Sequence, residues 1–368
     1  MEDHRYWIAL RMVSGVGDVL FRNLISKFGS PKCVFEAKSK ELERLEGIGE
    51  KTIHALSSFS EWDKVEQEVS RIKKSGFQLI NLHDSNYPKN LLAIYNPPPF
   101  LYLKGNILRE DEMAIAIVGT RVPDKYGRFV TEEIAGELGA RGITVVSGMA
   151  RGIDSIAHSG SLKRGGRTIA VLGSGLDVIY PPENKKLGEW ISSQGAVVSE
   201  FPLGTAPDSV NFPKRNRIIS GLSLGVVVVQ ASDKSGSLIT ASFALEQNRD
   251  VFAVPGNVGN RLSQGVNKLI KKGAKLVESV DDILTEIEAF KHLAAIRASD
   301  YSFSSMLSAL TQDERSVYSV LKDKSLHIDE IIKLTGIDSA RALSVLLSME
   351  LSGIVVQLPA KMFQLRRI

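Results

Sequence analysis

The chain has 368 residues, of which 43% are hydrophobic and 24% charged, and its formal net charge is +4. A chain of this length exceeds what one hydrophobic core usually holds, so we expect two or three domains. The single cysteine, Cys33, excludes an internal disulfide framework and a thiolate metal cage. The first residues are not expected to form a signal peptide, and no run of about 18 apolar residues occurs, so the composition predicts a cytoplasmic protein without membrane spans.

Residues 1–82 interleave charged and apolar positions at helical spacing, which predicts an N-terminal helical domain. Two similar phrases, Val13–Gly17 and Leu45–Gly49, each place two glycines just before an apolar helix. This is the pattern of a helix-hairpin-helix (SAM-like) turn, in which backbone N–H groups at a helix start approach a DNA phosphate. Plain helix-to-helix turns are the alternative, and Asp18 and Glu50 favour it because they would repel phosphate.

A segment rich in turn-forming residues follows, with His83–Pro88 and then Asn96–Pro99. Proline lacks a backbone donor and favours extended backbone, so this segment predicts a linker at a domain boundary.

Residues 83–290 form the second predicted domain, in which short β-branched runs alternate with amphipathic helical stretches. Strands that are apolar on both faces predict a parallel sheet covered by helices on both sides. The regular alternation therefore predicts an α/β fold with a doubly wound, Rossmann-like core. The expected strands are Ala114–Val118, Ile143–Val146, Thr168–Leu172, Ala196–Ser199, Val226–Val229, Val251–Val254 and Ala274–Val277.

The C-terminal part begins with a polar, serine-rich stretch at 291–306, which predicts a linker, and continues as a predicted winged-helix domain at 307–368. Its third helix carries Arg341 but few other cations, so DNA binding and protein binding remain equal alternatives. The expected elements are helices over Thr311–Leu321 and His327–Leu334, the latter stopped by Gly336, a third helix capped by Ser339 and ending at Gly353, and strands Ile354–Gln357 and Met362–Leu365.

The loops after the predicted parallel strands are rich in glycine and cations, and ligands of open parallel sheets bind beyond these carboxyl ends. Glycines let backbone N–H groups approach an oxyanion, and arginine offers paired donors that match phosphate. Phe212 lies beside three cations and offers a face on which a base can stack. The pattern predicts a site for a polyphosphate or for backbone phosphates, with tight turns and surface ion pairs as the alternatives. The loops are Gly119–Arg121, Ser147–Gly152, Gly173–Asp177, Ser199–Pro202, Asn211–Arg217 and Ser235–Leu238.

Catalytic and cofactor motifs are missing from these loops. Val178 occupies the place of the third glycine of a dinucleotide fingerprint, and no GxxxxGK[ST] phosphate loop exists. Asp154 is expected to hold Arg151 or cap a helix, and His158 is expected to be a packed histidine rather than a base. No clustered metal ligands and no Ser-His-Asp set are apparent, so we expect no cofactor, no metal and no catalytic residue.

Several long strings resemble the DNA-processing protein A (DprA/Smf) family across the whole chain and in order. They are IVGTR (117–121), SGMARGIDSIAH (147–158), TIAVLGSGLDVIYPPEN (168–184), FPKRNRIISGLS (212–223), SGSLITA (235–241) and VFAVPG (251–256).

The resemblance implies a dimer that binds and protects single-stranded DNA without sequence specificity. It also implies loading of RecA recombinase during natural transformation and homologous recombination, with single-strand binding protein as a further partner. Ile270 and Leu276 occupy the family's dimer surface. The implied DNA-binding residues are Arg121, Ser147, Gly148, Arg151, Gly152, Phe212, Lys214, Arg215, Asn216, Arg217, Ser235, Gly236 and Ser237.

The chain departs from the family pattern at three places. Pro182 follows the Tyr-Pro pair where many relatives carry lysine, and Lys185 or Lys186 is expected to replace that contact. Gln230 stands where relatives commonly have glutamate, and the tail hairpin lacks the paired glycines often found in the family's wing.

Two other function classes were weighed. The core also resembles enzymes that cleave small phosphorylated nucleosides, with Glu200 or Asp177 as acid or base. Such relatives carry a PGGxGTxxE-type loop, whereas Ser235–Ala241 contains no carboxylate. A scaffold acting mainly through protein contacts is the third alternative.

Overall fold

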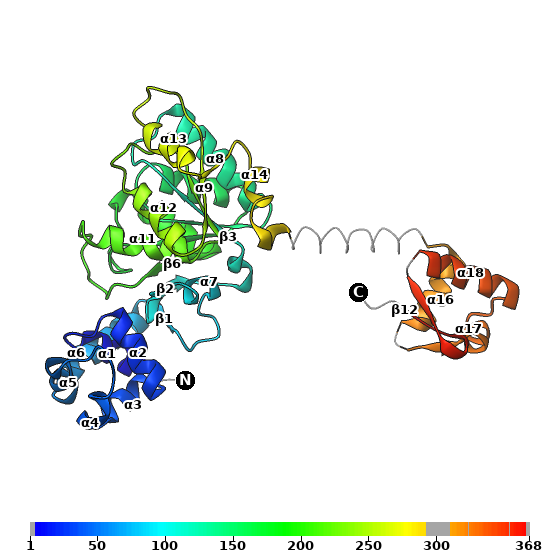
Figure 1. Cartoon of the computed structure of the whole chain (residues 1–368), viewed down its shortest axis with the longest axis horizontal. Helices are drawn as coiled ribbons and strands as arrows, with labels where there is room; N and C mark the ends of the chain where they lie inside the picture. Colours follow the sequence, from blue (N-terminus) through cyan, green and yellow to red (C-terminus); the bar gives the residue numbers. More distant parts are fainter. Residues whose placement is uncertain (1–3, 292–309, 323, 353, 366–368) are drawn as a thin grey trace. The chain divides into compact units, whose positions relative to one another are not determined.

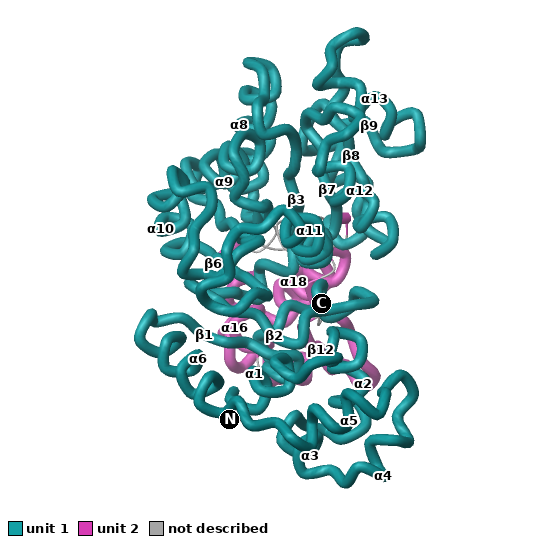
Figure 2. Tube along the Cα trace, turned by 90° about the vertical axis from the view of Figure 1, so that its left-hand side faces the viewer, with its two compact units in different colours: residues 1–290 teal, residues 291–368 magenta. Residues whose placement is uncertain are grey.

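The computed structural model describes residues 4–291, 310–322, 324–352 and 354–365. The chain forms two compact units, Met1–Phe290 and Lys291–Ile368, which are coloured teal and magenta in Figure 2. The predicted linker at 291–306 lies outside the described residues except for Lys291.

The N-terminal part of the first unit is helical, as predicted. Trp7 is fully buried and stacks on Phe21, with ring centroids 5.5 Å apart. Both glycine phrases form tight turns, because Gly15 (φ +88°) and Gly47 (φ +86°) adopt backbone conformations that side chains disfavour. The helices are α1 (His4–Met12), α2 (Asp18–Phe28), α3 (Pro31–Glu36), α4 (Ser39–Leu42), α5 (Glu50–Ser57) and α6 (Trp62–Lys74).

A nine-stranded sheet in the order β1-β2-β6-β5-β4-β3-β7-β8-β9 forms the centre of this unit (Figure 1). The strands from β6 to β9 in that order are parallel, and they match the seven strands predicted from the sequence to within a few residues. The predicted doubly wound fold is therefore confirmed. The parallel strands are β3 (Ala114–Val118), β4 (Thr144–Ser147), β5 (Thr168–Val171), β6 (Ala196–Ser199), β7 (Gly225–Val228), β8 (Asp250–Ala253) and β9 (Lys275–Leu276).

Helices cover both faces of the sheet, and the alternation of side chains along β3 shows how. Ile115 and Ile117 pack with side chains of α8, α9 and α14, whereas Ala114 and Ala116 pack with side chains of α11, α12 and α13. Every residue of β3 is buried, which explains its unbroken apolar sequence. The helices are α8 (Lys125–Ala140), α9 (Ile153–Lys163), α10 (Lys185–Gln194), α11 (Asn211–Gly221), α12 (Ser237–Glu246), α13 (Gln264–Lys271) and α14 (Val280–Leu284).

The segment predicted as a linker at a domain boundary connects two strands of the same sheet instead. Strands β1 (Gln78–Asn81) and β2 (Phe100–Gly105) pair antiparallel and extend the sheet beyond β6, and the proline-rich stretch with α7 (Lys89–Leu92) only connects them. Phe100 and Tyr102 pack into the cluster of the N-terminal helices, while Leu101 and Leu103 pack on the opposite side. This two-sided burial joins the N-terminal helices and the α/β core into one unit.

The second unit is a winged-helix domain, as predicted. Gly336 ends α17 in a left-handed conformation with φ +71°. The predicted cap of α18 was wrong: Asp338, not Ser339, accepts N–H bonds from Ala340 and Arg341, both at 3.1 Å. Asp338 has the extended backbone of a cap, so its oxygen faces the free N–H groups, while Ser339 is already helical. The expected stop at Gly353 lies outside the described residues.

The elements of this unit are α16 (Gln312–Leu321), α17 (Ile328–Thr335), α18 (Ser339–Leu351), β10 (Leu326–His327), β11 (Val355–Leu358) and β12 (Met362–Leu365). The two-residue strand β10 was not predicted, and it pairs with β12. No helix in the described part of the chain combines the length and apolar character needed to cross a bilayer.

Candidate nucleic-acid interface

The order of the parallel strands reverses at β3, whose neighbours are β4 on one side and β7 on the other. The loops after β3 and β7 therefore lead to opposite faces of the sheet and leave a crevice between them, which is where open α/β sheets bind ligands. A pocket of about 610 Å³ lies at this point. Its lining comes from the loop after β3, the starts of α9, α11 and α12, and Tyr180.

Phe212 lies at the start of α11 and is the aromatic centre of this pocket. Its ring centroid is 5.6 Å from Cζ of Arg121 and 5.9 Å from Cζ of Arg215, and the Tyr180 ring lies 5.8 Å away. A Cβ atom at Gly173 would lie 2.7 Å from the Phe212 ring, so glycine is required there. Phe212 is thus a half-buried aromatic face flanked by two guanidinium groups.

The two arginines near the ring differ in their exposure and in their hydrogen bonds. Arg121 is exposed, and its side chain has no carboxylate partner among the described residues. Arg215 is 4% exposed and donates to the carbonyl oxygens of Gly148 (2.6 Å) and Val171. Burial lowers the pKa of Arg215 to about 10, while the Asp154 carboxylate opposes this shift. Arg215 therefore stays charged at neutral pH as a fixed cation under the ring, and Arg121 is available to a ligand.

Asp154 is the one carboxylate among the described residues that line the pocket. Burial raises its pKa, although Arg215 opposes this effect, and its oxygen accepts an N–H bond from Ala150 at 3.3 Å. A Cβ at Gly148 would lie 2.7 Å from both the Asp154 carboxylate and the Arg215 guanidinium, so glycine lets these groups approach. Since Arg215 balances Asp154, Arg121 makes the pocket electropositive.

The N-termini of α11 and α12 open onto the same pocket. At the start of α12 the N–H groups of Leu238 and Ile239 already donate to backbone carbonyl oxygens, and the Ser237 N–H donates to the Ser235 hydroxyl oxygen at 3.4 Å. The start of α11 has no side-chain cap, and a helix start of this kind favours an anion. Ser235 and Ser237 lie beside the start of α12 with their hydroxyl oxygens 2.8 Å apart, and Gly236 between them is exposed. The Asn216 side chain donates to the Gly236 carbonyl oxygen at 3.4 Å, which holds this loop against α11.

Three residues of the loop after β4 that were predicted to bind DNA differ in their exposure and contacts. Gly152 adopts φ +78° and lies so close to the loop after β3 that a Cβ would be 2.5 Å from the Thr120 carbonyl oxygen. Arg151 is exposed and pairs with Glu183. The Ser147 hydroxyl is fully buried and donates to the Ile117 carbonyl oxygen at 2.6 Å, so it supports the floor of the site without lining the pocket.

Three predicted cations lie outside the pocket. Lys185 and Lys214 are exposed and do not line the pocket, and neither forms an ion pair within the described residues. Arg217 faces the N-terminal helices instead: it pairs with Asp18 (3.0 Å) and with Glu200, and only 11% of its side chain is exposed. The sequence placed Arg217 with the phosphate ligands, whereas the structure places it in a buried ion-pair cluster between α2 and the core.

The side chains considered for catalysis are engaged elsewhere. His158 is fully buried and its Nδ1 lies 2.7 Å from the Thr168 hydroxyl, and burial lowers its pKa to about 3, so it is a packed histidine as expected. Glu200 is part of the Arg217 cluster. Asp177 accepts bonds from the Gly204 N–H (2.7 Å) and from Arg71 (2.9 Å). None of these three side chains lines the pocket.

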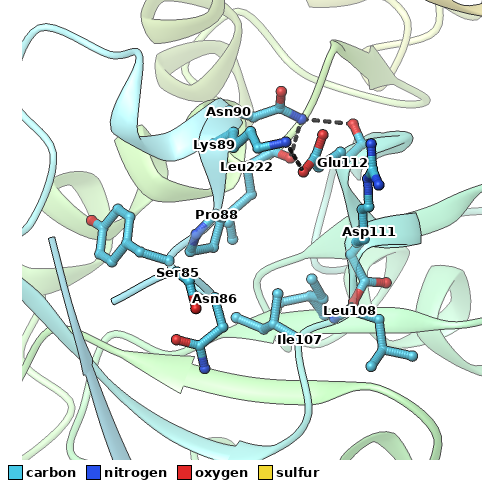
Figure 3. Close-up of a pocket in the computed structure, with 13 residues that line it drawn as sticks. Ser85, Asn86, Pro88, Lys89, Asn90, Ile107, Leu108, Asp111, Glu112 and Leu222 are labelled. Carbon is cyan, nitrogen blue, oxygen red and sulfur yellow. Dashed lines mark hydrogen bonds and ion pairs between the residues drawn. The ribbon is translucent and has the colours of Figure 1, made fainter. Parts of the chain in front are cut away.

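A second cavity, of about 510 Å³, opens near the amino ends of the strands and is shown in Figure 3. Lys89 pairs there with Glu112 at 2.9 Å, and the buried Asp111 pairs with Arg167 at 2.7 Å. The lining as a whole holds two cations, Lys89 and Arg109, and two carboxylates, so this cavity lacks the excess positive charge that a polyanion requires. Within the described ranges, no group of three or more metal-ligating side chains is suitably placed to hold a metal ion.

Comparisons with known proteins now identify the family. The family model for DNA recombination-mediator protein A matches residues 78–288, and those for the DprA winged helix domain and the SAM-like helix-hairpin-helix tandem match 304–361 and 8–58. Protein Smf of Synechocystis is 34% identical over 99% of this chain and 99% of its own length. The chain belongs to the DprA/Smf family.

Solved structures of DprA support the same assignment and confirm the predicted resemblance. DprA of Streptococcus pneumoniae is 35% identical with a TM-score of 0.69, over 78% of this chain and 99% of that chain. DprA of Helicobacter pylori, whose structure is described for its single-stranded DNA binding mode, is 32% identical with a TM-score of 0.52, over 60% and 98%.

Gly152→Ala tests how the loops of this DprA/Smf site depend on close backbone approach. The substitution is expected to destabilise the protein by about 2 kcal/mol or more, because a side chain at φ +78° is strained and the new Cβ would overlap the Thr120 carbonyl. Calorimetric unfolding measures the loss. Gly142 also has a positive φ, but the space around its Cβ position is open, so Gly142→Ala measures the cost of the backbone strain alone. Equal losses of stability in the two variants would contradict an overlap at Gly152.

Proposed function

We propose that this DprA/Smf family member binds single-stranded DNA without sequence specificity. The observation that carries this proposal is the half-buried Phe212 at the strand-order reversal, whose ring centroid lies 5.6 Å from Cζ of Arg121 and 5.9 Å from Cζ of Arg215. An aromatic face accepts any unpaired base, whereas a base inside a duplex does not present its face. Arg121 and the uncapped start of α11 supply donors for the backbone phosphates, which carry no sequence information. The single-stranded DNA binding of the Helicobacter relative supports this proposal.

The experiment compares single-stranded and duplex DNA of equal length at two salt concentrations. Binding to the single strand is expected to be tighter, independent of sequence, and weaker at high salt with a slope of about −0.7 per phosphate contacted. Fluorescence anisotropy measures both affinities. Equal affinity for duplex and single strand would contradict the proposal.

We further infer that the bound strand is protected and passed to RecA recombinase during DNA uptake and homologous recombination. The description of the matching family as a recombination mediator supports this role. Single-strand binding protein is then a competitor or partner on the same strand, and these partners place the protein in the cytoplasm. The expected result is faster RecA filament formation on DNA that single-strand binding protein already covers, and no acceleration would contradict this role.

A homodimer is also proposed, through the sheet edge at β9. Ile270 on α13 and Leu276 on β9 line a groove of about 590 Å³ with an apolar surface. Leu276 is 47% exposed and belongs to the last strand of the sheet, whose outer edge is unpaired. An exposed apolar groove along an open sheet edge favours a self-complementary contact with a second copy.

Leu276→Arg is expected to convert the dimer to a monomer, because it places an unpaired charge in the centre of the contact. Light scattering coupled to size exclusion measures the mass. Leu92→Arg is the control, since Leu92 on α7 is exposed to a similar degree (48%) and does not line the groove. A variant that keeps the mass of the wild type would place the dimer surface elsewhere.

We propose that the protein acts by binding rather than by catalysis. Glu200 and Asp177, the acids considered for nucleoside cleavage, contact Arg217 and Arg71 and do not line the pocket. The expected result is no release of free base from nucleoside monophosphates. Release that is lost in Glu200→Gln would revive the enzyme hypothesis.

A further inference from the structure

An exposed stripe of cations and apolar side chains continues from Arg121 into the first turns of α8. Val122 is 75% exposed, Tyr126 is 46% exposed and Phe129 is 66% exposed. Lys125 and Arg128 are exposed between them. Positions 125, 128 and 129 share one helix face, since residues three and four apart are neighbours on a helix. We call Arg121, Val122, Lys125, Tyr126, Arg128 and Phe129 the α8 stripe.

The cations of the α8 stripe are not engaged by the protein itself. Arg121, Lys125 and Arg128 form no ion pair within the described residues. The next acidic residues on the helix are already neutralised, because Glu132 pairs with Lys163 at 2.6 Å and Glu133 pairs with Arg164 at 2.8 Å. The stripe is therefore a positively charged surface that also exposes aromatic rings, the combination that binds single-stranded nucleic acid.

Two further acids lie near the stripe: the exposed Glu278, whose charge acts on Tyr126, and Asp124, which is held by the protein. The Asp124 carboxylate accepts bonds from the Gly127 N–H (2.9 Å), Gln230 (2.8 Å) and Asn260 (3.3 Å). These donors, the Gly127 N–H above all, lower the pKa of Asp124. Its charge is thus directed into the helix start, not toward the exposed face.

The stripe and the pocket are fixed to each other through Gln230. Its carbonyl oxygen accepts from the Thr120 N–H at 2.7 Å, next to Arg121, and its side chain bonds Asp124 at the start of α8. A Cβ at Gly127 would lie 2.1 Å from the Gln230 side chain, so the helix packs directly on it. On the outer side, the Tyr126 hydroxyl donates to the Pro255 carbonyl oxygen at 3.0 Å. A ligand that contacts both the pocket and the α8 stripe therefore binds two surfaces whose relative position is already fixed.

We propose that the strand bound at Phe212 continues across the α8 stripe, where Phe129 stacks on a base and Lys125 and Arg128 contact phosphates. The inference rests on the proposed function. Arg121 is the link, because it lines the pocket and begins the stripe. The occupant is an unpaired polynucleotide, because cations that form no ion pair within the described residues match its backbone and the rings between them match its bases.

The test uses the full chain with oligothymidylates of about 5 and about 20 nucleotides, lengths that fill only the pocket or extend beyond it. Phe129→Ala is expected to weaken binding of the longer strand about fivefold and leave the shorter one unchanged. Phe129→Tyr keeps the ring and is expected to keep the affinity. The double variant Lys125→Ala/Arg128→Ala is expected to lower the salt slope by about 1.4 for the longer strand only, about 0.7 per phosphate.

Two controls separate this inference from the proposed function. Lys73→Ala/Lys74→Ala removes the same charge from the exposed surface of α6 and is expected to change neither strand's affinity. If Arg121→Ala weakens both strands while the Phe129 and Lys125/Arg128 variants bind like the wild type, the α8 stripe is overturned and the pocket remains. If Arg121→Ala also has no effect, the proposed function itself fails.

A spectroscopic readout tests the stacking directly. Tryptophan fluorescence in F129W is expected to fall when the longer strand binds, because a base stacks on the ring. In Y95W, at a position that is 78% exposed beside Arg22, it is expected to stay constant. Fluorescence in F129W that is unchanged by DNA, or a Phe129→Ala variant that loses self-association and not DNA affinity, would overturn the proposal.

Discussion

Arg121→Ala is expected to weaken single-stranded DNA binding about 10- to 100-fold, equally for all sequences. The Arg121 guanidinium is exposed above the Phe212 ring and has no carboxylate partner among the described residues, so its donors are available to a phosphate. A hydrogen bond between charged groups contributes about 1.5–3 kcal/mol, which corresponds to the expected range. Fluorescence anisotropy at two salt concentrations measures the affinity and the loss of salt dependence.

Phe212→Ala at the same site is expected to lower affinity by about 1–3 kcal/mol, since base stacking contributes this much per base. Phe212→Tyr keeps the ring and is expected to retain binding, which separates stacking from a change in the pocket's shape. Lys73→Ala, an exposed charge on α6, serves as the control for Arg121→Ala. Wild-type affinity in both Arg121→Ala and Phe212→Ala would show that DNA binds elsewhere.

Arg217→Met is expected to destabilise the first unit by about 3–5 kcal/mol, the loss typical of a broken buried ion pair. Arg217 pairs with Asp18 and Glu200, whose side chains are 14% and 7% exposed, and it donates to the Asn96 carbonyl oxygen at 3.0 Å. Without it, Glu200 loses its ion-pair partner at a site with little solvent, whereas Asp18 keeps its ion pair with Arg11 at 3.2 Å. Calorimetric unfolding measures the change, and Arg151→Met, which breaks the exposed pair with Glu183, is expected to change stability little.

The same variant is expected to regain stability as the pH falls. Burial already raises the pKa of Glu200, and Arg217 opposes this rise, so removing Arg217 raises that pKa further. When the folded-state pKa lies above the unfolded-state value, the penalty is complete above the folded-state pKa, decreases as the pH falls between the two values, and is gone below the unfolded-state pKa. The gap between Arg217→Met and wild type is therefore expected to narrow toward the ordinary glutamate pKa of about 4.3. A gap that is independent of pH, or that persists in Arg217→Met/Glu200→Gln, would contradict this account.

Arg215 and Arg217 have different surroundings that the sequence alone does not predict. Both belong to the cationic run that opens α11, and the run as a whole predicts a phosphate site. On a helix, positions two apart differ by about 200° in direction, so the two side chains point to opposite sides. Arg215 lies under Phe212, and Arg217 reaches Asp18 on α2, which is distant in sequence. Helical geometry could have predicted that the two side chains point in different directions. It could not have predicted that Arg217 pairs with Asp18.

The β1–β2 pair was missed for a related reason. The prolines before Phe100 indicate a linker, and the apolar run Phe100–Leu103 that follows them is as short as many loop segments. Its pairing with β6 and its burial on both sides depend on the N-terminal helices, which come from elsewhere in the chain. Antiparallel edge pairing of this kind leaves little local pattern.

The parallel sheet, the winged-helix tail, the glycine turns of the N-terminal helices and the loops at the carboxyl ends of the strands were all predictable from the sequence. They depend on periodicity and on residues that tolerate unusual backbone, which are local properties. Which side chains of those loops meet a ligand became clear from the folded chain alone. Folding exposed Arg121, buried Arg215 beneath Phe212, turned Arg217 toward Asp18 and enclosed the Ser147 hydroxyl. The physical reason is that burial and ion pairing depend on neighbours brought together by folding.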